Sequence, residues 1–180
     1  MPVHVALLRS VNVGGRSLPS AELRALCAGV GFDRVRTYIQ SGNVVFDDPS
    51  AEEEPLRARI EEALAAAAGF PVPVLLRSPA DLRHVVDRQP FAARGAAPRQ
   101  LHVSFLAGPP APGGADRLER DALRHAPDEC RLGVREVYLY CPDGYGRSKL
   151  TPAFLEARLR VPTTTRNWNT VLQLLAMAEA

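Results

Sequence analysis

The strongest constraint in the sequence is a predicted β-hairpin spanning residues 35–46. Two runs rich in β-branched and aromatic residues flank the tetrapeptide Gln-Ser-Gly-Asn, residues 40–43. Runs of this kind on both sides of a glycine-containing turn are typical of antiparallel strands. Two turn registers are open, but they differ by two residues and therefore place the same side chains on one face. The side chains predicted to be buried by the hairpin are Ile39, Val44 and Phe46.

The predicted elements around this hairpin occur in an order that repeats. The first half contains a strand at 3–8, a helix before Gly31, the hairpin, a helix before Gly69 and a strand at 72–77. This order, strand-helix-strand-strand-helix-strand, is ferredoxin-like. After residue 101, a strand, a helix, a second hairpin and another helix follow in the same order. The sequence therefore predicts an α+β fold of two ferredoxin-like (βαββαβ-type) halves.

The second half is predicted to end differently from the first. Apolar residues at helical spacing follow Thr165, so a long C-terminal helix is expected to open near this threonine in place of the last strand. Between the halves, residues 92–100 are mostly glycine, proline, alanine and arginine, a composition typical of a boundary between domains. The predicted domains are residues 1–91 and residues 101–180.

The overall composition excludes several classes of protein. Hydrophobic residues make up 46% of the chain and charged residues 23%, which is ordinary for a globular protein. No stretch approaches the roughly 20 apolar residues of a membrane helix, and the first residues do not resemble a signal peptide. The three cysteines are odd in number and far apart, which argues against a disulfide framework. We therefore expect a cytoplasmic protein that does not associate with membranes.

The sequence holds no recognisable catalytic motif. The only lysine, Lys149, follows Ser148, so the chain has no phosphate-binding loop of the Walker A type. The four histidines and three cysteines lack the spacing of metal ligands, and no Gly-x-Ser-x-Gly nucleophile motif occurs. No catalytic residue, metal or cofactor is predicted, and whether the protein is an enzyme stays open.

Three polar segments are candidates for binding an anion. The loop Arg9–Arg16 lies between a strand and a helix, where backbone N–H groups can face a ligand, and its Gly-Gly pair lets the backbone approach closely. The second segment is the turn at 41–43. The third, Thr165–Asn169, combines arginine and asparagine donors with a helix N-terminus. A fourth and weaker basic loop is Tyr145–Lys149. The candidate ligand-binding residues are Arg9, Asn12, Gly14, Gly15, Ser41, Asn43, Thr165, Arg166, Asn167 and Asn169.

We predict that the Arg9–Arg16 loop and the Thr165–Asn169 helix start lie close together and form an anion site. Its ligand would be a phosphate-bearing small molecule or a nucleotide, held by charge-assisted hydrogen bonds. Two alternatives stay open. RNA or single-stranded DNA would bind on the sheet face by stacking on Tyr138 and Tyr140, although a net charge of +2 gives little attraction to nucleic acid. Otherwise the protein is an interaction module without a small-molecule ligand, and the polar loops only hold the two halves together.

Three strings in the chain resemble a known bacterial family. They are ALLRSVNVGG at residues 6–15, VRTYIQSGNVVF at residues 35–46 and TTRNWNTV at residues 164–171. The family is called domain of unknown function 1697. The resemblance implies an α+β fold in two ferredoxin-like parts, and it implies no reaction.

Overall fold

The computed structural model describes residues 1–11, 14–15, 17–39 and 42–180 of the chain. The chain forms two compact units. The first unit consists of residues 1–84 together with 173–180, and the second unit consists of residues 85–172. The domain limits placed in the sequence at residues 91 and 101 stay a prediction.

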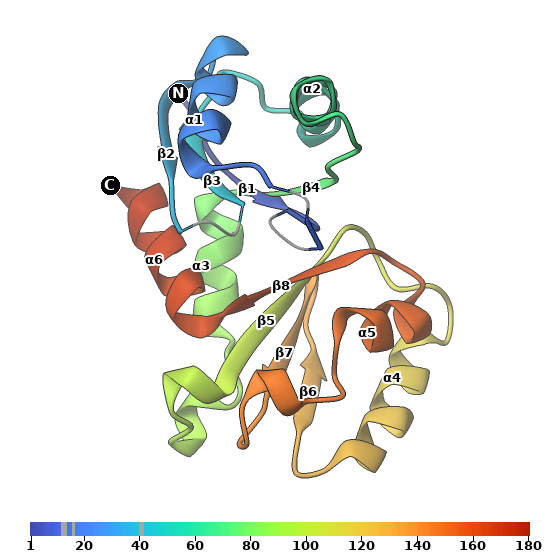
Figure 1. The fold of residues 1–180 in the computed structure, drawn as a ribbon. Helices are drawn as coiled ribbons and strands as arrows, with labels where there is room; N and C mark the ends of the chain where they lie inside the picture. Colours follow the sequence, from blue (N-terminus) through green and yellow to red (C-terminus); the bar gives the residue numbers. More distant parts are fainter. Residues whose placement is uncertain (12–13, 16, 40–41) are drawn as a thin grey trace. The chain divides into compact units, whose positions relative to one another are not determined.

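A four-stranded antiparallel sheet forms the centre of the first unit (Figure 1). The elements are β1 (Val3–Leu8), α1 (Ser20–Gly29), β2 (Asp33–Thr37), β3 (Asn43–Asp47), α2 (Glu53–Ala68), β4 (Val74–Arg77) and α3 (Pro79–Asp87). The strands lie in the order β2-β3-β1-β4, and every neighbouring pair is antiparallel. Strand, helix, two strands, helix and strand therefore follow one another in the predicted ferredoxin-like order.

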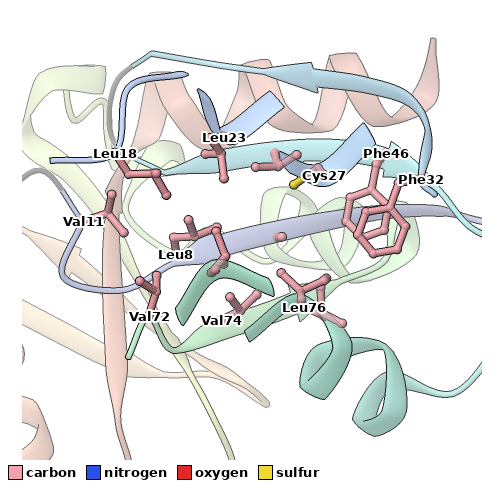
Figure 2. Close-up of a cluster of buried hydrophobic side chains, with 14 of the residues drawn as sticks. Leu8, Val11, Leu18, Leu23, Cys27, Phe32, Phe46, Val72, Val74 and Leu76 are labelled. Carbon is pink, nitrogen blue, oxygen red and sulfur yellow. The ribbon is translucent and has the colours of Figure 1, made fainter. Parts of the chain in front are cut away.

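The core of the first unit lies on one face of this sheet. Because side chains alternate between the faces of a strand, Leu8, Phe46 and Leu76 all point to the same side. There they pack with residues of α1 and α2 such as Leu23 and Ile60 into one buried cluster (Figure 2). Burial of each large apolar side chain contributes about 1.5–3 kcal/mol, so this cluster is the main source of stability for the unit.

The predicted hairpin is confirmed, with one correction. Strands β2 and β3 pair antiparallel, with Thr37 opposite Val44, and both Val44 and Phe46 are fully buried. The placement of Ile39 on the buried face is wrong. Its side chain is 49% exposed, because β2 ends at Thr37 and Ile39 lies in the connecting loop with a φ of +48°. The turn residues Gln40 and Ser41 lie outside the described residues.

The second unit repeats the arrangement of the first. Its elements are β5 (Leu101–Leu106), α4 (Gly114–Ala122), β6 (Glu129–Leu132), β7 (Glu136–Tyr140), α5 (Pro152–Leu159) and β8 (Thr163–Asn167). The last helix, α6 (Trp168–Glu179), begins in this unit, and its residues from 173 onward belong to the first unit. Short 3₁₀ helices are η1 (Ala92–Arg94), η2 (Pro98–Gln100), η3 (Leu123–His125) and η4 (Tyr145–Arg147). The strand order β6-β7-β5-β8 corresponds strand for strand to that of the first sheet, and all pairs are again antiparallel.

The end of the second unit differs from the prediction. Residues 163–167 form β8, which pairs with β5 along its whole length, so the last strand is present and the C-terminal helix follows it. The helix begins at Trp168, three residues after the predicted start at Thr165. Its N-cap is Asn167, whose Oδ1 accepts a hydrogen bond from the N–H of Thr170 at 2.8 Å. Within the described parts of the chain, no helix is long and apolar enough to span a membrane.

Candidate anion-binding site

Two of the three predicted segments meet at one end of the first sheet. The N–H of Leu8 donates to the carbonyl of Gly42 at 2.8 Å, and the N–H of Arg9 donates to the carbonyl of Pro73 at 2.8 Å. The start of the Arg9–Arg16 loop therefore lies beside the hairpin tip. Gly14 and Gly15 follow as exposed residues with φ of +61° and +82°, a backbone that favours glycine. Two of the predicted ligand-binding residues, Asn12 and Ser41, lie outside the described residues.

Asn43 has a structural role in the hairpin. It is fully buried, and its side-chain amide donates to the carbonyl of Tyr38 at 3.1 Å while its own carbonyl accepts from the N–H of Tyr38. These two bonds close the loop between β2 and β3. A role for Asn43 in binding a ligand stays a prediction.

The third predicted segment lies in the second unit and spans β8 and the start of α6. Thr165 forms a hydrogen bond with Ser104 between their hydroxyl oxygens at 3.0 Å, so its side chain links β8 to β5. Asn167 caps α6 and Asn169 is exposed on its first turn. Because Arg9 and this segment belong to different units, their predicted convergence on one anion stays a prediction.

Arg166 is buried on the opposite face of β8 from Thr165. Its Nη1 donates to the hydroxyl of Thr164 at 2.8 Å and to the carbonyl of Thr165 at 3.0 Å. Burial lowers the pKa of the guanidinium to about 10, which still leaves it charged at neutral pH. The segment thus holds a buried cation in a polar environment.

Tyr138 and Tyr140 do not form a pair of open stacking platforms for bases, and the nucleic-acid alternative stays a prediction. Tyr138 is buried, and its hydroxyl donates to Oε1 of Glu136 at 3.0 Å. Tyr140 packs against Phe91 with ring centroids 5.7 Å apart, and Arg94 covers both rings. Base stacking requires an open aromatic face, which Tyr138 lacks and which Tyr140 shares with Phe91 and Arg94.

A charged cavity of about 350 Å³ lies within the second unit. Its lining includes the side chains of Arg124, His125, Asp128, Asp143, Arg147 and Lys149. Two regions of the chain build it: the end of η3 with the turn that leads into β6, and the turn after β7 that contains η4. These regions are about 20 residues apart in sequence, and the β6–β7 hairpin brings them together.

The turn after β7 is anchored on both sides of its basic residues. Leu150 is fully buried, and Ser148 is buried with its hydroxyl accepting from the N–H of Leu150 at 3.0 Å. Tyr145 stacks on His102 of β5, with ring centroids 4.4 Å apart. The exposed residues Arg147 and Lys149 alternate with these buried anchors, so their side chains are held at the cavity while the backbone stays fixed.

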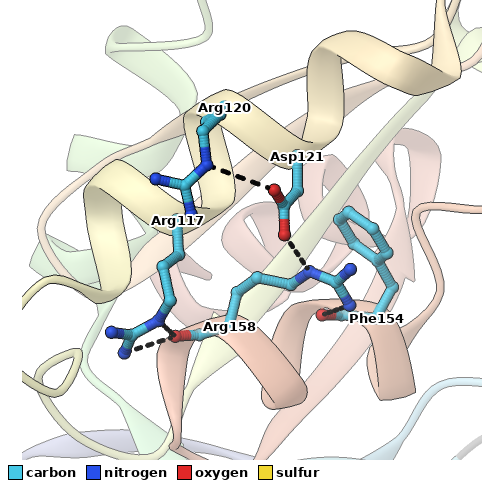
Figure 3. Close-up of polar contacts among 5 residues, drawn as sticks. All are labelled: Arg117, Arg120, Asp121, Phe154 and Arg158. Atoms are coloured by element: carbon cyan, nitrogen blue, oxygen red, sulfur yellow. Dashed lines mark hydrogen bonds and ion pairs between the residues drawn. The ribbon is translucent and has the colours of Figure 1, made fainter.

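A polar network joins α4 and α5 (Figure 3), and its Phe154 contacts His125, which lines the cavity. His125 packs edge-on against Phe154, with ring centroids 5.0 Å apart. The guanidinium of Arg158 lies 3.8 Å from the centroid of the Phe154 ring, and its Nε donates to Oδ2 of Asp121 at 3.1 Å. Arg117 in turn donates to the carbonyl of Arg158 at 3.2 Å. The side chain of His125 therefore packs against a group of side chains that connects α4 and α5.

The charges at the cavity are not neutralised by one another. Among the described residues, Arg124, Arg147 and Lys149 form no ion pair, and the same holds for Asp128 and Asp143. Other arginines of this unit do pair with carboxylates, as Arg94 does with Glu129 and Arg158 with Asp121. Cations gathered without partners around a cavity favour a bound anion.

The sequence identified half of this cavity. Tyr145–Lys149 was recognised as a basic loop, although as the weakest of four. Arg124 and His125 were missed, because a basic pair at the end of a helix is ordinarily explained by the helix dipole. The single signal that could have indicated them is the predicted hairpin at 129–141, since antiparallel strands bring the residues on either side of them together.

Two further kinds of reactive site would be a metal centre and a nucleophilic cysteine. Among the described residues, no three His, Cys, Asp or Glu side chains gather closely enough to hold a metal ion. All three cysteines are free thiols, and burial raises the pKa of each to about 11. Because the thiolate is the nucleophilic form, none of them is suited to covalent catalysis at neutral pH.

The fold and the cavity define a protein of two ferredoxin-like units with a basic cavity in the second. The chain belongs to the family described as protein of unknown function (DUF1697), whose model matches residues 1–138, and the resemblance seen in the sequence is thereby confirmed. The chain is also similar to a solved structure, that of conserved bacterial protein SP0830 from Streptococcus pneumoniae, with a TM-score of 0.73 and 21% identity. That match covers 100% of this chain and 99% of the other, and it supports the fold alone. Among curated proteins, none matches the chain.

Proposed function

We propose that the protein binds a phosphate-bearing small molecule in the basic cavity of the second unit. The observation that carries this proposal is the group of three cations, Arg124, Arg147 and Lys149, which line one cavity with His125 and form no ion pair among the described residues. Cations held close together repel one another, and among the described residues the carboxylates of Asp128 and Asp143 in the same lining form no ion pair with them. An anion that reaches several of the cations relieves this repulsion.

Phosphate fits the cavity better than a carboxylate does. A phosphate monoester carries close to two negative charges at neutral pH and three acceptor oxygens, so it can satisfy several donors at once. An arginine guanidinium recognises two of these oxygens in parallel, and a lysine ammonium adds a point charge. A cavity of about 350 Å³ also lies within the range of about 300–1,000 Å³ that is usual for small-molecule sites.

The proposed setting is the cytoplasm. Three free thiols are compatible with a reducing compartment, where phosphorylated metabolites are also abundant. Within this proposal the ligand is a small molecule, and the surface of the β7 strand has no role as a platform for nucleic acid.

Isothermal titration calorimetry with ribose 5-phosphate at low ionic strength tests the proposal. The double variant Arg147→Ala/Lys149→Ala removes two of the cavity cations, and we expect at least about a tenfold loss of affinity because two charge-assisted contacts are lost. The matched control is Arg24→Ala/Arg99→Ala, which removes the same charge from two exposed arginines outside the cavity. Equal affinity of the two double variants, or no binding to the unaltered protein, would overturn the proposal.

The predicted segments are a second candidate location for the same ligand. Gly14 and Gly15 have the left-handed backbone that turns successive N–H groups toward an anion, and Arg166 is a buried cation. The variants Arg9→Ala and Arg166→Ala belong in the same titration. Loss of affinity in these variants, with Arg147→Ala/Lys149→Ala unaffected, would assign the ligand to the segments and remove it from the cavity.

A further inference from the structure

A second, larger depression adjoins the basic cavity. It has a volume of about 640 Å³ and runs along α4, η3 and β6, and it lies within the second unit. It shares Ala126 and Asp128 with the basic cavity, so the two depressions form one continuous surface. We call the larger depression the α4–β6 groove.

Part of the lining of the α4–β6 groove is apolar. Between charged residues of α4 and β6 the lining contains Ala122, Leu123, Ala126 and Cys130. Leu123 stands out because its side chain is 80% exposed. An exposed leucine by itself is ordinary, but here it lies in a concave surface next to a cluster of unpaired cations.

We propose that the ligand of this surface is a nucleotide. This inference rests on the proposed function: the phosphate occupies the basic cavity, the ribose lies beside Asp128, and the base lies in the α4–β6 groove against Leu123. The order of the three subsites along the surface is the order of the three parts of a nucleotide.

Asp128 is suited to the ribose by its position and its chemistry. It is half-buried, it lines both depressions, and among the described residues its carboxylate has no hydrogen-bond or ion-pair partner. Its backbone is fixed by a hydrogen bond from its N–H to the carbonyl of His125 at 3.0 Å. A carboxylate accepts hydrogen bonds readily from vicinal hydroxyls, whereas it repels a phosphate. Its presence at the margin of a cationic cavity therefore favours a ligand that carries hydroxyl groups next to its phosphate.

The apolar and acidic residues that line the α4–β6 groove are suited to a base. A flat ring that covers Leu123 removes apolar surface from water on both partners. Asp116 and Glu119 of α4 line the same groove, and neither has an ion-pair partner among the described residues. Their carboxylates are acceptors for the exocyclic amine of adenine, cytosine or guanine. An extended aliphatic ligand would gain nothing from these acceptors.

Titrations with three probes of increasing size test the inference: inorganic phosphate, ribose 5-phosphate and adenosine 5′-monophosphate. We expect affinity to rise at each step. Leu123→Ala should weaken the binding of adenosine 5′-monophosphate by up to about tenfold, because part of an apolar contact is lost. The affinities for the other two probes should stay unchanged. The matched control is Val134→Ala, which truncates an apolar side chain that is 69% exposed and lies outside the groove.

Asp128→Ala separates the ribose subsite from the phosphate subsite. Removing a negative charge can only strengthen the binding of bare phosphate, so a loss of affinity restricted to ribose 5-phosphate and adenosine 5′-monophosphate reports contacts to hydroxyls. The nucleotide inference is overturned if ribose 5-phosphate binds as tightly as adenosine 5′-monophosphate. It is also overturned if Leu123→Ala changes the affinity for neither of these two ligands. In both cases phosphate binding stands. If none of the three probes binds, the proposed function itself has failed.

Discussion

The two units share one strand order but use their charged residues differently. The first unit contains nine basic and eleven acidic residues, and the second contains thirteen basic and nine acidic residues. In the first unit the buried carboxylates of Asp47 and Asp48 are paired with Arg34 and Arg59, so arginine there mainly stabilises structure. In the second unit Arg124, Arg147 and Lys149 surround a cavity and form no ion pair among the described residues. A repeated fold can therefore gather unpaired cations around a cavity in one copy, because the loops and not the sheet determine where charge gathers.

The β2–β3 hairpin of the first unit and the β6–β7 hairpin of the second unit also differ. Each requires a glycine, but for a different reason. In the first unit a Cβ at Gly42 would lie 2.7 Å from the Cβ of Leu8, so the glycine permits contact between two backbones. In the second unit a Cβ at Gly133 would lie 2.0 Å from Oε1 of Glu136, so the glycine makes room for a carboxylate that three donors hold. The first requirement is steric, and the second preserves a polar network.

The largest effect is expected from substitution of Gly42. Gly42→Ala should lower the free energy of unfolding by about 2–4 kcal/mol, because the left-handed φ of +71° is strained for alanine and the added methyl group meets Leu8. Gly69→Ala is the matched control, since Gly69 has a φ of +76° and no atom near the added Cβ, and we expect a loss of about 1 kcal/mol. Urea unfolding followed by circular dichroism measures both. Equal losses would show that the close contact with Leu8 does not matter.

A smaller effect is expected at the start of α6. Asn167→Ala should lower the free energy of unfolding by about 1 kcal/mol, because the N–H of Thr170 loses its acceptor. Asn169→Ala removes an exposed asparagine two residues further along the same helix and should change stability by less than about 0.5 kcal/mol. The same unfolding measurement distinguishes them. A greater loss for Asn169→Ala would contradict the helix start at Trp168.

The smallest expected effect is a dependence of stability on pH through His102. Burial lowers the pKa of His102 from its usual value of 6.5, so the unfolded chain binds a proton more readily than the folded protein does. Stability is therefore greatest above about pH 6.5 and falls as the pH is lowered through that value. His102→Phe keeps an aromatic ring against Tyr145 and removes the titration. Melting temperatures between pH 7 and pH 5 should fall less for this variant than for the unaltered protein, and parallel curves would exclude His102 as the cause.

The features that could be predicted from the sequence are those that depend on residues close together along the chain. Both hairpins and the ferredoxin-like order were predicted correctly, because turn residues and apolar alternation are local signals. Strand β8 was missed, since its residues, Thr-Thr-Thr-Arg-Asn, carry no apolar alternation and its partner β5 lies some 60 residues away. Ile39 was assigned to the buried face because the predicted strand continued past Thr37. The cavity is made by two separate turns, so no local pattern indicates it, although one of its loops was recognised as basic.

The first unit is made of two separate segments of the chain, and this has a consequence for its synthesis. Its sheet is complete at Arg77, yet the unit also includes residues 173–180, where Glu179 accepts hydrogen bonds from Arg83 of α3. On the ribosome, therefore, the first unit is the first to be started and the last to be completed as a chain. Residues 173–180 are translated only after the whole of the second unit, so along the chain the second unit is inserted into the first. A fragment ending near residue 91 would carry the first sheet without the helical turns that belong to the same unit.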